Sequence, residues 1–124
     1  MKTVTTRATT RAELLAPAGS PEALEAAVAA GADAVYFGAS AYNARMGAKT
    51  FGDEELADAI RLCRATGVKT NITVNTLAYD RELAGLIKTV ERLYILGCDA
   101  LIVADLGAAA LIHKYFPDLT LHAS

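Results

Sequence analysis

The sequence predicts an α/β fold that forms part of a (β/α)8 TIM-type barrel, with five parallel strands and four helices. Short apolar runs alternate with stretches of helical period, in the order strand, helix, strand. The connections are short, which implies parallel strands joined by right-handed crossovers. The sequence also stops on a strand, whereas a complete doubly wound domain would cover its last strand with a helix. A five-stranded doubly wound sheet is the alternative fold.

The expected strands share a short apolar run that is bounded by turn residues. They are residues 13–16, 34–37, 69–74, 100–104 and 119–122. The second of them, Ala34 to Phe37, is entered from a helix that ends at Gly31. It leads at Gly38 into a connection that reaches Gly52. A loop of that length in an α/β unit is often functional.

Capping residues mark where the first two helices begin. Ser20 followed by Pro21 places a hydroxyl at the N-cap and a proline at the first helical position. Either Gly52 or Asp53 is expected to cap the second helix, and Gly67 to end it.

The later helices are marked by period and by their ends. The third helix has the clearest 3.6-residue period, with Asp80 as its expected cap and Gly97 at its end. The fourth is expected from about residue 108 to 116, where Pro117 stops it.

The domain organisation is expected to be simple. Residues 1–12 are Thr- and Arg-rich and are expected to form a disordered tail. Residues 13–124 then form the N-terminal half of a barrel that is truncated from something longer. A half barrel leaves two open strand edges, which invite self-association.

Composition excludes several classes of protein. The formal charge is −2, and residues 1–12 carry Lys2, Arg7 and Arg11 but no acid, so the rest of the chain is more acidic than the whole and opposes stand-alone nucleic-acid binding. No apolar run approaches the length of a membrane span. Cys63 and Cys98 do not have zinc or thioredoxin spacing. Without a secretory signal they are read as reduced thiols in a cytoplasmic protein.

The candidate site lies where the strands end, because ligands of parallel α/β folds meet the carboxyl ends of the strands. The expected substrate-binding residues are Asn43, Arg45 and Asn75, and the expected catalytic residues are Asp105 and His122. A guanidinium suits a carboxylate or phosphate, and Asn43 adds amide hydrogen bonds. No metal cluster emerges from these residues.

Each candidate has a plainer interpretation beside the functional one. Arg45 could be a solvated loop arginine. Asp105 could be a base or the N-cap of the fourth helix, and Asn75 could cap its own turn. His122 could transfer a proton or be a packed core histidine. His113, in the middle of a helix, is expected at the surface.

The cysteines are not expected to act as nucleophiles. Cys63 is expected on the inward face of the second helix, and Cys98 precedes the fourth strand, at the opposite end of the sheet from the candidate site. A buried structural thiol is inert. No serine, histidine and acid triad, paired-carboxylate site or phosphate-cradling glycine loop is recognised among the candidate residues.

Several segments together resemble the N-terminal part of peptidase family U32, the collagenase-like proteases. They are residues 13–19 (ELLAPAG), 31–38 (GADAVYFG), 43–45 (NAR) with Phe51, 99–105 (DALIVAD) and 122–124 (HAS). The resemblance covers nearly the whole chain after Ala12 and implies a (β/α)8-type barrel. It implies that Asn43, Arg45, Asn75, Asp105 and His122 stand at the barrel mouth.

The resemblance implies two kinds of activity. Some members are peptidases or collagenases. Others are hydroxylation proteins, which act on pyrimidines of tRNA or ribosomal RNA and use prephenate, or which act on ubiquinone precursors. Several of the latter hold an iron–sulfur cluster on four cysteines, which Cys63 and Cys98 cannot provide. No cofactor is therefore expected within this chain, although the full-length parent could carry the cluster.

These observations lead to one interpretation and one alternative. The chain is expected to supply one wall of the active site of a U32 enzyme and to be inactive alone. Its partners would be a small anionic or peptide substrate, with nucleic acid bound only through other parts of the parent. The alternative is a non-catalytic module that binds a small anion or self-associates.

Overall fold

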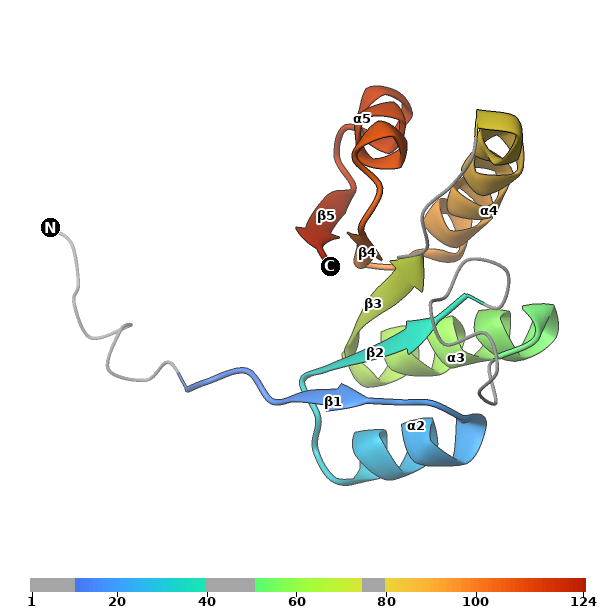
Figure 1. The fold of residues 1–124 in the computed structure, drawn as a ribbon. Coiled ribbons are helices and arrows are strands. Elements are labelled where there is room, and N and C mark those ends of the chain that lie inside the picture. The colour runs from blue at the N-terminus through green and yellow to red at the C-terminus, as the bar shows by residue number, and fades with distance from the viewer. Residues whose placement is uncertain (1–10, 40–50, 75–79) are drawn as a thin grey trace, which may run out of the picture.

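The computed structural model describes residues 11–39, 51–74 and 80–124, and it folds them around one parallel sheet (Figure 1). The strands are β1 (Leu15–Pro17), β2 (Ala34–Gly38), β3 (Lys69–Val74), β4 (Ala100–Val103) and β5 (Thr120–Ala123). The helices are α2 (Pro21–Ala29), α3 (Asp53–Thr66), α4 (Leu83–Leu96) and α5 (Leu106–Tyr115), and a 3-10 helix, η1 (Asp80–Glu82), precedes α4.

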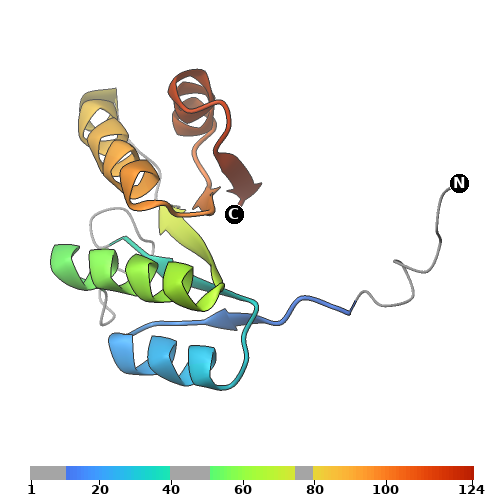
Figure 2. The same cartoon turned by 180° about the vertical axis from the view of Figure 1, so that it is seen from behind.

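The strand order identifies the architecture. The strands pair in the order β1-β2-β3-β4-β5, and every pair is parallel. Each helix packs on the next one along the chain, so α2 to α5 form one layer. In Figure 1, α3 lies behind β2, and it passes in front of β2 when the molecule is seen from behind (Figure 2). A doubly wound sheet reverses its strand order and divides its helices between two faces. The partial barrel is therefore confirmed, and the doubly wound alternative is wrong.

The core lies between the sheet and the helical layer. Alternate residues of the strands, including Val35, Phe37, Ile72 and Leu101, belong to the same buried cluster as the inward residues of the helices. Because side chains of a strand alternate between its two faces, the residues between them point to the other side. We call that other side the helix-free face. It carries residues 36, 71, 73, 102 and 122.

Several expected boundaries differ from the observed ones by one or two residues, and two of the differences are informative. Pro17 lies just after the strand expected at residues 13–16 but is the last paired residue of β1, which an edge strand tolerates because its free side needs no N–H. Asp80 does not cap the third helix. It begins η1, and the N-cap of α4 is Glu82, whose side chain makes no capping hydrogen bond. The expected caps Ser20 and Gly52 are confirmed.

The amino ends of β2 and β4 share one kind of contact, in which an aspartate carboxylate accepts a backbone N–H. Asp33 and Asp99 each follow a Gly-x pair and immediately precede a strand, and each accepts a backbone N–H from a neighbouring strand or its approach. Asp33 Oδ2 accepts the N–H of Leu14 at 2.7 Å, and Asp99 Oδ2 accepts that of Thr70 at 2.8 Å. These carboxylates lie at the end of the sheet opposite the candidate site, where barrel residues typically serve stability.

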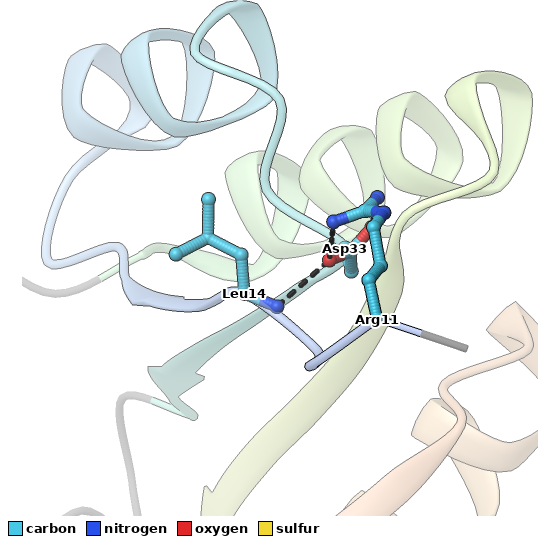
Figure 3. Close-up of polar contacts among 3 residues, drawn as sticks. All are labelled: Arg11, Leu14 and Asp33. Atoms are coloured by element: carbon cyan, nitrogen blue, oxygen red, sulfur yellow. Dashed lines mark hydrogen bonds and ion pairs between the residues drawn. The ribbon is translucent and has the colours of Figure 1, made fainter. Parts of the chain in front are cut away.

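Arg11 strengthens the Asp33 contact. Its guanidinium donates to both carboxylate oxygens, at 3.0 Å to Oδ2. Asp33 therefore binds two residues of the segment before β1, Arg11 and Leu14 (Figure 3). The Leu14 N–H, and after it the Arg11 guanidinium, lower the pKa of Asp33 below its ordinary value.

Candidate functional site

The mouth of the partial barrel is formed where the strands end. Beyond β2, Ala39 donates its N–H to the carbonyl of Thr73 at 3.2 Å, and it pairs with Phe51 in a parallel bridge. The Phe51 ring packs 4.6 Å from that of Phe37 and is 1% exposed. Glu55 accepts the N–H of Gly52 at 3.2 Å and closes the first turn of α3. Ala39 and Phe51, the described residues on either side of positions 40–50, therefore lie together beside β2 and β3.

The three predicted substrate-binding residues cannot be placed. Asn43, Arg45 and Asn75 lie outside the described residues. Their roles stay predictions. The flanking residues Ala39, Phe51 and Val74 are described, and each of them is buried.

Asp105 stands directly after β4 as the N-cap of α5. Its Oδ1 accepts the N–H of Ala108 at 2.9 Å, while its backbone is extended, as an N-cap requires. The cap explains why α5 begins at Leu106, two residues earlier than expected. The capping interpretation is confirmed, and a part in proton transfer stays a prediction.

His122 projects from β5 on the helix-free face. It is paired with Ile102 of β4, which in turn is paired with Thr73 of β3. Its flanking residue Leu121 packs against the core, so alternation points His122 away from the helices. The side chain is exposed, and within residues 11–39, 51–74 and 80–124 it makes no hydrogen bond or ion pair. It is not a packed core histidine.

The sequence reasoning missed three polar residues on the same face. Tyr36 and Asn71 are paired in register on β2 and β3, and Thr73 lies one step further toward the mouth. Thr73 donates its hydroxyl to the carbonyl of Phe37 at 3.3 Å. The period-2 alternation of residues 69–74 was a signal for two of them, since Asn71 and Thr73 alternate with the core residues Ile72 and Val74.

Two cavities lie in the helical layer rather than at the helix-free face. One of about 340 Å³ opens between α3 and α4, beside Lys88 and Arg92. Arg92 is already paired with Asp53, Nη1 to Oδ2 at 3.0 Å. The other, of about 220 Å³, lies between α2 and α3.

Both thiols are buried and unsuited to nucleophilic attack. Burial, reinforced by the negative charge of Asp99, raises the pKa of Cys63 to about 11 and that of Cys98 to about 12. In the described part of the chain, no three histidine, cysteine or acidic side chains gather as metal ligands. The expectation that neither cysteine is a nucleophile agrees with this environment.

Comparison with known families now identifies the chain. The sequence model of "Peptidase family U32" matches residues 19–124, most of the chain. The chain belongs to peptidase family U32. The resemblance seen in the sequence is thus confirmed.

Relatives of this U32 chain carry names of two kinds. It is 40% identical over 97 residues to "Collagenase" of Porphyromonas gingivalis, covering 77% of this chain and 23% of that protein. It is 36% identical over 112 residues to "tRNA hydroxylation protein P" of Escherichia coli, covering 90% and 25%. It is also 36% identical over 114 residues to "23S rRNA 5-hydroxycytidine C2501 synthase" of Escherichia coli, covering 92% and 17%. The U32 chain therefore spans about a quarter of the length of these relatives or less.

Solved structures place the fold among barrels. "The Structure of the U32 Peptidase Mk0906" superposes with a TM-score of 0.74 at 16% identity, covering 93% of this chain and 49% of that one. A type I 3-dehydroquinate dehydratase from Clostridium difficile superposes with a TM-score of 0.59 at 16% identity, covering 83% and 42%. Among the described residues, none of the helices is both long and apolar enough to cross a membrane.

Proposed function

We propose that this U32 chain forms one wall and part of the mouth of a barrel that hydroxylates a base of tRNA or ribosomal RNA. Relatives named for tRNA and rRNA hydroxylation match 90% or more of the chain. RNA modification would take place in the cytoplasm. Because the body of the chain is acidic, the phosphate backbone would be bound mainly by other parts of the protein.

The observation that carries this proposal is the chemistry of the helix-free face. Tyr36, Asn71 and Thr73 offer uncharged hydrogen-bonding groups, and His122 offers an imidazole, the side chain that most often serves as a general acid or base in enzymes. Such a wall suits a neutral, polar, planar substrate. Peptide hydrolysis needs an activated nucleophile or water, and the thiols of this chain are protonated at neutral pH.

The reaction divides into parts that this wall can and cannot perform. With water as the oxygen source, hydroxylation of a ring carbon replaces a C–H bond by a C–OH bond and releases two protons and two electrons. A two-electron acceptor held by other parts of the protein must therefore act beside this wall. His122 is the proposed proton-transfer group. Any part of Asp105 in proton transfer would come in addition to its capping bond to Ala108.

The loop residues complete the proposed mouth. Arg45 would bind an anionic group, and Asn43 and Asn75 would add amide hydrogen bonds. The described residues that flank Asn43 and Arg45 in the sequence, Ala39 and Phe51, pair in a bridge at the carboxyl end of β2.

An iron–sulfur cluster does not fit the residues of this chain. Such a cluster takes four cysteine thiolates, and the chain has two cysteines, both buried with raised pKa values. A cluster, where the protein uses one, would be bound by residues outside this chain.

The test compares two activities of the intact protein. Undermodified tRNA and rRNA are incubated with it, digested to nucleosides and analysed by mass spectrometry for one added oxygen. Gelatin and collagen peptides are incubated in parallel. We expect an oxygenated pyrimidine and no cleavage. Peptide cleavage without base oxygenation would overturn the proposal in favour of the peptidase activity.

Self-association is a second candidate function. Within the described sheet, β1 and β5 each have a strand neighbour on one side, and Leu14 and Leu15 beside the first edge are 51% and 48% exposed. Unpaired edges of this kind recruit other strands. Size-exclusion chromatography of residues 1–124 would show concentration-dependent dimers. A monomer with cooperative melting would contradict this candidate.

A further inference from the structure

Tyr36 and Asn71 form a pair of polar side chains inside the partial barrel. They are direct register partners on β2 and β3, and both are half-buried on the helix-free face. Directly opposed residues of neighbouring strands lie about 5 Å apart. One aromatic ring and one amide therefore stand side by side, deeper in the barrel than His122.

We propose that Tyr36 and Asn71 contact the pyrimidine base that is to be hydroxylated, with Tyr36 against its face and Asn71 on its hydrogen-bonding edge. The proposal rests on the proposed function and adds residues that determine base binding. It distinguishes these residues from the mouth residues, which handle the proton and the anionic groups.

The polarity of the helix-free face is the first argument. The interior of a (β/α)8 barrel is ordinarily filled by layers of bulky branched apolar side chains. Here the register row through Tyr36 continues with Asn71, Ala100 and Thr120, and the next row holds Gly38, Thr73, Ile102 and His122, so each row mixes polar residues with small or apolar ones. Polar groups in a barrel interior need hydrogen-bond partners, which a polar ligand supplies.

Small neighbours and unused hydrogen bonds are the second argument. Around the pair, the same face carries the small residues Ala34, Gly38 and Ala100. Among the described residues, the Tyr36 hydroxyl makes no hydrogen bond. Asn71 donates from Nδ2 to the carbonyl of Val35 at 3.5 Å, the outer limit for such a bond, which leaves its Oδ1 and second N–H available.

The ligand chemistry follows from these two side chains. An aromatic ring accepts a base on its face, and an asparagine amide offers a donor and an acceptor to a base edge. A base must leave the helical stack to enter such a pocket, as in other enzymes that modify bases. A pyrimidine is the smaller ring and fits the product named for the rRNA-modifying relative.

The test uses Tyr36→Phe, Tyr36→Ala and Asn71→Ala in the intact protein with its RNA substrate. Tyr115→Phe, on an exposed side chain of α5, is the matched control. We expect Asn71→Ala and Tyr36→Ala to raise KM about tenfold or more, with kcat changed much less, because base binding is lost. Tyr36→Phe keeps the ring and should raise KM only a few-fold, and Tyr115→Phe should leave it unchanged.

Thermal unfolding of each variant separates binding from packing. KM values equal to wild type in Asn71→Ala and Tyr36→Phe, with lowered melting temperatures, would show that the pair only packs within the barrel, and would overturn the inference. Normal base hydroxylation with unchanged KM would sink the inference while the proposed function stands. A wild-type protein that oxygenates no base would sink both.

Discussion

Phe51 provides the sharpest test of how the barrel mouth is built. Its ring is 1% exposed and packs 4.6 Å from Phe37, so Phe51→Ala removes a fully buried aromatic side chain. Such truncations cost about 3–5 kcal/mol, of which the aromatic pair accounts for roughly 0.5–1.5 kcal/mol. Because native domains are stable by about 5–15 kcal/mol, Phe51→Ala would lose roughly a fifth or more of a typical free energy of unfolding.

Urea denaturation followed by circular dichroism measures this loss. Phe51→Leu retains most of the volume and should cost about 1.5 kcal/mol or less. Ile95→Ala, at a side chain 76% exposed on α4, is the control and should stay within about 0.5 kcal/mol of wild type. A Phe51→Ala variant that loses less than about 1 kcal/mol would refute the packing of Phe51 against Phe37.

The remaining predictions concern a cap, an acid-sensitive carboxylate and the thiols. Asp105→Ala should lower the free energy of unfolding by about 1 kcal/mol, whereas Asp105→Asn retains the cap on Ala108 and should change it by a few tenths; equal losses would contradict the capping role. Because folding lowers the pKa of Asp33, its carboxylate stabilises the folded state at pH values above the ordinary carboxyl pKa. This stabilisation is lost as the pH falls through the lowered pKa. Asp33→Asn should therefore flatten the pH dependence of melting below about pH 4, and an unchanged acid limb would count against the contact. With pKa values of about 11 and 12, Cys63 and Cys98 should react with a thiol reagent at pH 8 only after unfolding; rapid native labelling would contradict their burial.

Local signals in the sequence were sufficient for the element order. The strand at 69–74 is observed with those bounds, and Gly67 and Gly97 end their helices in the left-handed conformation that glycine favours. The weaker boundaries were those set by competing signals. Asp80 resembles a helix cap, but the chain first forms a 3-10 turn and enters α4 three residues later.

The faces of the sheet were harder to predict, because they depend on tertiary partners. In residues 34–37 every side chain is apolar or aromatic, so the run alone does not tell that Tyr36 faces away from the helices. The pairing of Tyr36 with Asn71, in register on neighbouring strands, shows which way Tyr36 faces. The contacts of Asp33 and Asp99 could be found only from the structure, because their carboxylates accept backbone N–H groups that lie 19 and 29 residues away in the sequence.

The central claim is that the helix-free face, at the carboxyl end of the strands, meets the substrate. Turnover of RNA by His122→Ala, compared with His113→Ala, tests it most directly, because His113 is exposed on α5 in the helical layer. We predict that His122→Ala lowers kcat/KM by about 100-fold or more, as loss of a proton-transfer group does, while His113→Ala stays close to wild type. Equal activity of the two variants would contradict the claim.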